Sequence, residues 1–310
     1  VTQIKGDSET HPKLSPDDEL ADFERLPRGA AQSEAVSAGA YARSALLRGL
    51  QIGRSAGANP FEFGMIGSTG SHTGLASADE DYFWGARPDD SDASAQGLTA
   101  VWAEENTRTS IFSAFKRREV YATTGPRMRV RFFGGWTFTA KHASKANMVT
   151  LGYTLGHPMG SNLSDAPDDG APTFLMYAVR DPEGASLDRI QMVKGWVDAE
   201  GETHEKVYDV VWSGARERDP DGKLAPVNDL VDLKTGANLD VEGAPSLHAF
   251  WSDPHFDREQ PAFYYLRVLQ IPTPRHTLYD ALARGVDPGA SGYPPTIQER
   301  AYTSPIWYTP

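Results

Sequence analysis

The 310-residue chain contains no cysteine. This absence excludes a disulfide framework, a thiolate metal site and a cysteine nucleophile. Long apolar runs are missing as well, since none approaches the roughly 20 residues that a bilayer-spanning helix needs. The first residues, VTQIKGDSETHP, lack the apolar core of a secretory signal. We therefore expect no membrane span.

Positive charge is scarce: 30 Lys and Arg stand against 42 Asp and Glu, giving a net charge of −12. This balance argues against a protein whose main task is to neutralise a nucleic-acid backbone. The chain also lacks the Gly-x-x-x-x-Gly-Lys spacing of a phosphate-binding loop and the Gly-x-Ser-x-Gly elbow of a serine hydrolase. With 39% hydrophobic residues, it has the composition of an ordinary globular protein of about two domains.

Residues 1–125 mix strand-like and helical patterns, which predicts an α/β layer architecture. An Ala-rich helix is expected from about residue 34 to 55, capped by Ser33, and a second helix from about 109 to 118. Strands are expected at VTQIK, FEFGMI and EVYAT.

From residue 126 the pattern changes to short β-rich runs separated by turn clusters such as DPEG and DPDGK. The runs cover residues 127–136, 147–156, 172–181, 188–197, 206–213 and 262–271. Their spacing predicts an antiparallel sandwich over residues 126–272. Residues 273–310 are proline-rich, with one helical pattern at 278–285, and are interpreted as a tail packing on the other domains.

His72 is the first candidate site residue. It lies in IGSTGSHTGL, a loop of small residues directly after the apolar run 61–66. The carboxyl end of a buried strand is where α/β folds place ligands, so His72 is a candidate metal ligand or base. An equally weighted interpretation is a histidine that caps the next turn.

The loop KGDSETHP offers Lys5, Glu9 and His11 after the first strand. Alternate residues of an extended chain point the same way, so Glu9 and His11 are candidates to converge on one cation while Lys5 meets an anion. A solvated polar loop has the same composition and is the favoured interpretation. Arg118, in a cationic helix end, is a candidate anion contact, although the helix dipole alone accounts for cations there. His157, His248 and His255 receive no role, and the aromatics of the β region, Tyr208 included, are interpreted as core.

Several long motifs resemble one known family: FGMIGSTGSHTGLASADEDYFWG, IFSAFKRREVYATTGPRMRVRFFGGW, FYYLRVLQIPTPRHTLYDALARGVDP and ERAYTSPIWYTP. They are similar to the C-terminal half of a bacterial family labelled domain of unknown function 3604, related to the PHP (polymerase and histidinol phosphatase) metal-dependent hydrolases. The resemblance covers nearly the whole chain. It implies the C-terminal part of a distorted (β/α) barrel in residues 1–125, followed by a β-rich domain.

The resemblance further implies two or three divalent ions, Zn, Mn or Fe, that activate water for ester hydrolysis. Carried onto this sequence, it makes His72, Glu9 and His11 metal ligands and places Lys5, Glu9 and Arg118 at the substrate. Two departures stand out. The family loop has Asp where this chain has Gly70, and the His-x-His and Asp-His motifs of the first half of such a barrel are missing.

Three explanations of these departures stay open: a missing N-terminal segment or second chain that completes the barrel, a degenerate relative that binds without catalysing, or inactivation by Gly70. The first is favoured for the missing half, because half a barrel leaves strand edges unpaired. The resemblance also suggests a bacterial protein that is periplasmic or secreted, and an oligomer is compatible with it.

The leading hypothesis is thus a PHP-type metal-dependent hydrolase acting on a small phosphoric or similar ester. The alternative is a non-catalytic binding protein in which the β-rich domain recognises a carbohydrate or another chain.

Overall fold

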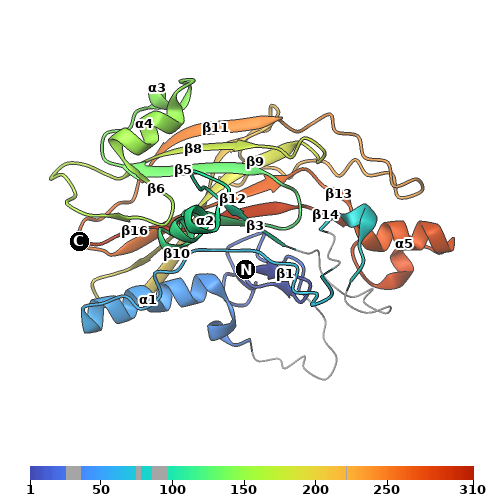
Figure 1. Ribbon diagram of the computed structural model, residues 1–310, viewed down its shortest axis with the longest axis horizontal. Coiled ribbons are helices and arrows are strands. Elements are labelled where there is room, and N and C mark those ends of the chain that lie inside the picture. The colour runs from blue at the N-terminus through green and yellow to red at the C-terminus, as the bar shows by residue number, and fades with distance from the viewer. Residues whose placement is uncertain (26–35, 75–77, 86–96, 221) are drawn as a thin grey trace.

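Two antiparallel sheets facing each other form the centre of the molecule (Figure 1). The computed structural model describes residues 1–25, 36–74, 78–85, 97–220 and 222–310. The larger sheet runs in the order β10 (Thr203–Trp212), β9 (Leu187–Val197), β12 (Ala262–Gln270), β15 (Arg300–Thr303), β4 (Val120–Thr123) and β3 (Leu98–Val101). In addition, β16 (Ile306–Tyr308) pairs with β12, and β7 (Asn162–Leu163) pairs in parallel with β16. The smaller sheet runs β11 (Ser246–Ser252), β8 (Thr173–Val179), β5 (Arg129–Gly135) and β6 (His157–Pro158).

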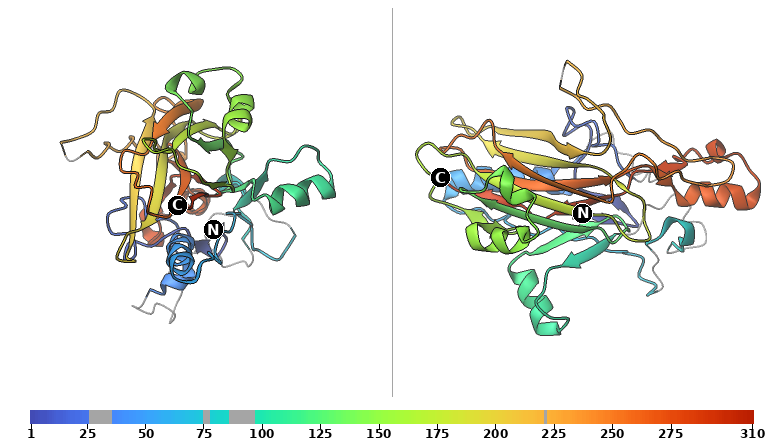
Figure 2. Two further views of the ribbon diagram at one scale, coloured as in Figure 1. Left: turned by 90° about the vertical axis from the view of Figure 1, so that its left-hand side faces the viewer. Right: turned by 90° about the horizontal axis from the view of Figure 1, so that it is seen from above.

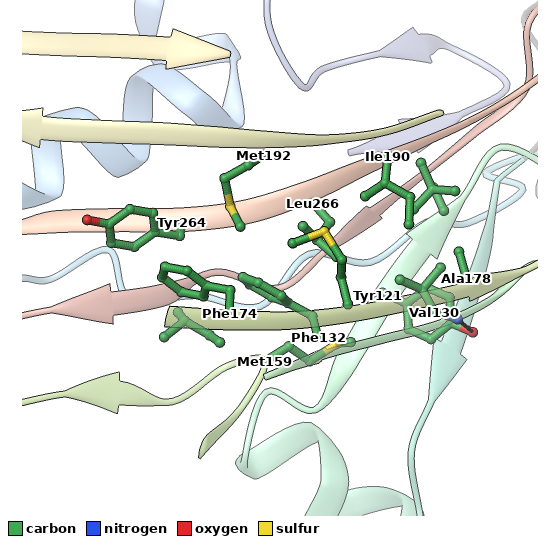
Figure 3. Close-up of a cluster of buried hydrophobic side chains, with 14 of the residues drawn as sticks. Tyr121, Val130, Phe132, Met159, Phe174, Ala178, Ile190, Met192, Tyr264 and Leu266 are labelled. Carbon is green, nitrogen blue, oxygen red and sulfur yellow. Dashed lines mark hydrogen bonds between the residues drawn. The ribbon is translucent and has the colours of Figure 1, made fainter. Parts of the chain in front are cut away.

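The main core fills the space between the two sheets (Figure 3). Phe132 and Phe174 of the smaller sheet meet Met192, Tyr264 and Leu266 of the larger one. The Phe132 and Phe174 rings stack 5.5 Å apart, and Phe174 lies 4.7 Å from Tyr264. Inward side chains of two facing sheets make a sandwich core, so the antiparallel, sheet-rich character predicted from residue 126 onward is confirmed.

Helices cover the outer faces of both sheets. Leu46 and Leu50 of α1 (Ala42–Ala56) pack with Val193, Phe263 and Trp307 on the outer face of the larger sheet. On the other side of the molecule, α3 (Ala140–Ala143) and α4 (Met148–Leu155) lie against the smaller sheet, as Figures 1 and 2 show. Because of this cover, β12 is buried on both of its faces.

One predicted strand, residues 147–156, is wrong: this segment forms the helix α4. Met148 and Gly152 are its buried positions, at the i, i+4 spacing of a helix face. A Cβ on Gly152 would come 2.5 Å from the Phe133 ring, so the missing side chain lets the helix lie directly on the sheet. The apolar run was compatible with either period, and tertiary packing decides in favour of the helix.

The two predicted helices of residues 1–125 correspond to α1 and to α2 (Arg108–Lys116), which projects from the sandwich (Figure 2). The expected cap Ser33 lies outside the described residues. The strand EVYAT is confirmed as β4, whereas VTQIK reduces to β1 (Thr2–Gln3), a hairpin partner of β2 (Gly6–Asp7).

A closed (β/α) barrel is not formed by the described part of residues 1–125. Here β3 and β4 are antiparallel and extend the larger sheet, and FEFGMI forms no strand. Parallel pairing is limited to one bridge, Thr2 with Gly67, in this part of the structure. Strands on both sides of residue 125 therefore share one sheet.

The C-terminal region also enters this sheet, because β15 and β16 pair with β12 in its middle. The predicted helix near residues 278–285 is α5 (His276–Arg284), held beside the short pair β13 (Thr273–Pro274) and β14 (Thr296–Ile297). Across the described ranges, no helix has the length and apolar character that a bilayer crossing requires.

Candidate functional site

Glu9 belongs to a buried ionic cluster, which we define as Glu9, Asp18, Arg43 and Arg267. Arg43 of α1 binds Glu9 and, at 2.8 Å, Asp18. Arg267 of β12 binds Asp18 at 2.6 Å and Glu9 at 3.3 Å. The side chains of both arginines are fully buried, and both carboxylates are 2% exposed. Two arginines and two carboxylates thus pair inside the protein, and Arg43 also binds the partly exposed Glu205 at 3.0 Å.

The two arginines of this cluster favour the ionised form of Asp18. Burial alone would raise the pKa of Asp18, but Arg267 and Arg43 hold that pKa well below its usual value. The same carboxylates raise the pKa of Arg43 and of Arg267 against the effect of burial. Tyr265 also donates its hydroxyl hydrogen to Glu9. Both oxygens of Glu9 therefore have partners within the protein.

His11 lies near the ionic cluster but is engaged by other groups. Its Nδ1 is 3.0 Å from the backbone nitrogen of Lys13, and its Nε2 is 3.1 Å from Arg25. Its ring contacts Tyr41 edge-on at 5.5 Å. Burial lowers the pKa of His11, and the positive charges of Arg25 and Lys13 lower it further. The ring thus has donors against both nitrogens, and the convergence of Glu9 and His11 on one cation is not observed.

Lys5 and His72 follow two segments that run side by side in the same direction. Thr2 bridges Gly67 in parallel, and the Ile4 amide donates to the Thr69 carbonyl at 3.0 Å. Both side chains therefore leave from the same end of this pair, and both residues are exposed. His72 has a φ of 61°, a conformation uncommon outside glycine.

Arg118 is separated from these residues. It donates to the carbonyls of Gly160 and Glu62 at 2.8 and 3.0 Å and lies 5.0 Å over the Trp307 ring. It packs beside Gly64, at the start of the run that leads to the His72 loop. In the described portion of the chain, no group of three His, Asp or Glu side chains has a geometry that could hold a metal ion.

A pocket of about 400 Å³ lies at the free edge of the larger sheet, around β10. We call it the edge pocket. Its walls are contributed by the N-terminal loop, by β9 and β10, and by loops that follow β10 and β11. Its polar lining consists of Asp17, Asp18, Glu19, Gln191, Lys206, Tyr208, Asp209, Arg218, Lys223 and His255.

Three of the four acidic groups of the edge pocket are ion-paired. Arg189 binds Glu19 at 3.2 Å and Asp209 at 3.3 Å, and Gln191 donates to Asp209 at 2.8 Å. Asp18 belongs to the ionic cluster described above. Among these lining acids only Asp17 forms no ion pair within the described structure.

The cations of the edge pocket are in the opposite situation. No ion pair joins Lys206, Arg218 or Lys223 to a carboxylate of the described residues, and all three are exposed. Lys206 lies 5.1 Å over the Tyr208 ring, and Arg218 lies 5.3 Å over Trp212. The edge pocket therefore offers three cations without a carboxylate partner in the described structure, in a protein of net charge −12.

Tyr208 and His255 add ring surfaces and polar atoms. The Tyr208 hydroxyl is 3.2 Å from Nδ1 of His255, and the two rings lie roughly parallel, 6.2 Å apart. Burial, followed by the charge of Asp253, raises the pKa of Tyr208, which keeps the phenol neutral. Sequence reasoning assigned Tyr208 to the core and gave His255 no role. The polar residues that alternate in the β10 segment, close to the DPDGK turn, are a signal that could have pointed to this edge.

A second cavity, of about 490 Å³, lies between the end of α1 and β16. Its lining is largely apolar and includes Leu50, Pro261 and Trp307. Of its two acidic residues, Glu62 and Glu259, Glu62 is held by Asn162 at 3.1 Å and lies 3.7 Å from Arg118. This cavity offers fewer uncompensated charges than the edge pocket.

The sequence matches one family profile over residues 1–310, described as "Protein of unknown function (DUF3604)". The chain belongs to this family. No curated protein matches the sequence at a significant level. Because the DUF3604 description assigns no activity, the function of this DUF3604 chain has to be argued from its own residues.

Proposed function

We propose that this DUF3604 chain is a ligand-binding protein whose edge pocket takes a small hydroxylated anion, such as a sugar acid or a sugar phosphate. The observation that carries the proposal is the set of cations in the pocket: Lys206, Arg218 and Lys223 have no carboxylate partner in the described structure, while three of the four acids are ion-paired. An anionic group would complete this arrangement.

The remaining walls suit a hydroxylated body. The volume of about 400 Å³ falls within the usual range for small-molecule sites. Tyr208 and His255 present ring faces together with polar edges, and Asp17 offers oxygen acceptors for hydroxyl hydrogens.

Titration calorimetry with glucuronate, glucose 6-phosphate and glucose tests this proposal. We expect both anions to bind more tightly than glucose, with an affinity that falls as salt is added. Lys206→Ala combined with Arg218→Ala should weaken anion binding by at least about tenfold, whereas Lys145→Ala, an exposed lysine elsewhere, should leave it unchanged. Equal binding of glucose and glucuronate, or binding that survives the double substitution, contradicts the proposal.

The relation to PHP hydrolases and the metal-dependent ester hydrolysis stay predictions. The described residues do not fit the implied metal centre, because Glu9 is held by two arginines, His11 is engaged at both nitrogens and His72 is exposed. A centre with Zn, Mn or Fe would need further ligands. The test is turnover of an aryl phosphate with added Mn²⁺ or Zn²⁺, which His72→Ala should abolish if His72 is a ligand; unchanged turnover in that variant removes the assignment.

Gly70 bears on the same prediction. It has a φ of 64°, and a Cβ at this position would come 2.5 Å from the Gln3 side-chain oxygen. Gly70→Asp therefore requires the Gln3 side chain to move. It also places a residue with a side chain in a left-handed backbone conformation that glycine adopts more readily. If the loop is a degenerate metal site, this substitution should still tighten Mn²⁺ binding measured by calorimetry; no change counts against that interpretation.

A further inference from the structure

Three buried glutamates from distant segments meet beside α5. We call Glu24, Glu80 and Glu299 the carboxyl cluster. Glu24 forms a two-pronged ion pair with Arg275, at 2.9 Å for each oxygen. Glu299 accepts a hydrogen bond from the Thr124 hydroxyl. Glu80 accepts the backbone N–H of His276, in the first turn of α5, at 2.6 Å.

Glu80 is the member with an unsatisfied atom. Its Oε1 is buried and has no hydrogen-bond partner within the described structure. A buried, unpaired carboxylate oxygen is costly when charged, and a proton on the group removes most of that cost. The surroundings are mainly acidic: Glu24 and Glu299 face Glu80 from two other segments, and Asp79 is its chain neighbour.

The groups of α5 stabilise the charged form of Glu80 only in part. Arg275 and the His276 amide both favour the charged form of Glu80, and the Tyr279 phenol also faces it. However, Arg275 is already bound to Glu24 by both prongs. Burial, and after it the charge of Glu24, raises the pKa of Glu80 to about 8. Burial and Glu80 likewise raise the pKa of Glu299 well above its ordinary value.

Glu80 also belongs to a segment that is attached to α5 by a ring stack. Phe83 lies 4.0 Å from the His276 ring at an interplanar angle of 16°. The intervening Tyr82 is 62% exposed, and Trp84 is 58% exposed, so Glu80 and Phe83 point inward while these two aromatics point to solvent. The carboxyl of Glu80 and the ring of Phe83 are thus the main side-chain anchors of residues 79–84.

We propose that Glu80 is a proton-operated latch, which holds residues 79–84 on α5 when its carboxyl is protonated and releases them when it ionises. In the released segment Glu80 is solvated and has an ordinary pKa. Between the ordinary pKa and that of the attached group, each rise in pH therefore favours release. The protonation state of Glu80 thus determines whether the exposed pair Tyr82 and Trp84 is held in a fixed position on α5.

Hydrogen exchange of the intact chain, corrected for the intrinsic pH dependence of exchange, tests the latch. Between about pH 6 and about pH 8.5 we expect the corrected exchange of peptides covering residues 79–84 and the first turn of α5 to rise at least about tenfold. Peptides of α1 should keep their protection, which separates local release from unfolding. Wild-type exchange that does not change with pH overturns the proposal without any variant.

Two substitutions sharpen the result. Glu80→Gln keeps the shape and the acceptor for His276 but cannot ionise, so its corrected exchange should be independent of pH. Asp81→Asn, in the same segment but exposed, should behave as the wild type. If Glu80→Gln retains the wild-type rise, ionisation of Glu80 is not the cause and the latch is refuted. If Asp81→Asn abolishes the rise, the charge of the segment as a whole is responsible, and the assignment to Glu80 is equally refuted.

Discussion

The two faces of β12 are buried in different ways. On one face Tyr264 and Leu266 pack into the apolar space between the sheets. On the other, Phe263 and Tyr265 meet α1, and Arg267 continues that face into the ionic cluster. The first face is closed mainly by apolar contacts, with one hydrogen bond from Tyr264 to Asp253. The second combines apolar contacts with charges that need particular partners.

This difference affects how uniquely the fold is specified. Apolar packing tolerates many substitutions of similar volume. A buried arginine requires its carboxylates, and Arg267 is satisfied only when the N-terminal loop brings Asp18 and Glu9 to the sheet. The ionic cluster therefore selects one placement of this loop, although a buried ion pair adds little net stability over an apolar replacement.

The ionic face should be the more sensitive of the two to loss of a single group. Asp18→Ala removes the carboxylate that both buried arginines share and leaves Arg267 with Glu9 alone and Arg43 with Glu9 and the partly exposed Glu205. We expect a loss of about 3–5 kcal/mol in the free energy of unfolding. Urea denaturation measures it. The neighbouring Asp17 is exposed, so Asp17→Ala should change stability by less than about 0.5 kcal/mol. Equal effects of the two substitutions would mean that the cluster contributes nothing.

The apolar face should respond through cavity formation. Leu266→Ala removes a fully buried side chain between the sheets and should cost about 2–5 kcal/mol, with the lower part of this range reached if neighbouring side chains move in. The same denaturation experiment applies. Leu239, which is 60% exposed, provides the matched control, since Leu239→Ala leaves no cavity. A loss at Leu266 below that of the control contradicts the placement of the core.

Sequence reasoning found the apolar face more readily than the ionic one. The β-rich run 262–271 predicted β12 because strand-favouring residues are visible in the local sequence. The partners of Arg267 could not be predicted: Glu9 is 258 positions away, and only the tertiary fold joins them. The edge pocket could not be predicted either. The sequence shows Lys206 and Arg218, but it does not show that Arg189 is ion-paired with the pocket acids Glu19 and Asp209. The prediction of a strand at residues 147–156 was wrong because the apolar pattern of this segment fits both the strand and the helix period.

A third variant probes the charge balance beside the ionic cluster. Burial, and after it the charge of Glu9, raises the pKa of Asp7 to about 7. Between the ordinary pKa of an aspartate and about pH 7, the folded protein therefore keeps a proton that the unfolded chain has released, so stability falls as pH rises. Asp7→Asn stays neutral and keeps an acceptor for the Glu9 amide.

We accordingly expect Asp7→Asn to match the wild type near about pH 4 and to exceed its stability at about pH 8 by at least about 1 kcal/mol. Thermal or urea unfolding at a series of pH values gives both curves. Glu105→Gln, at an exposed glutamate, is the control and should leave the pH dependence unchanged. Parallel curves for Asp7→Asn and wild type would show that Asp7 is ionised in the folded protein.

The smallest expected effect lies at the free edge of the same sheet. Lys206 is exposed and forms no ion pair with a described carboxylate, so Lys206→Ala should change the free energy of unfolding by less than about 0.5 kcal/mol. The same substitution should nevertheless weaken glucuronate binding, because the lysine serves the ligand rather than the fold. A large loss of stability in Lys206→Ala would show that Lys206 is needed for folding, as the buried charges of the ionic cluster are. It would then contradict the distinction between a structural ionic cluster and a pocket that is open to a ligand.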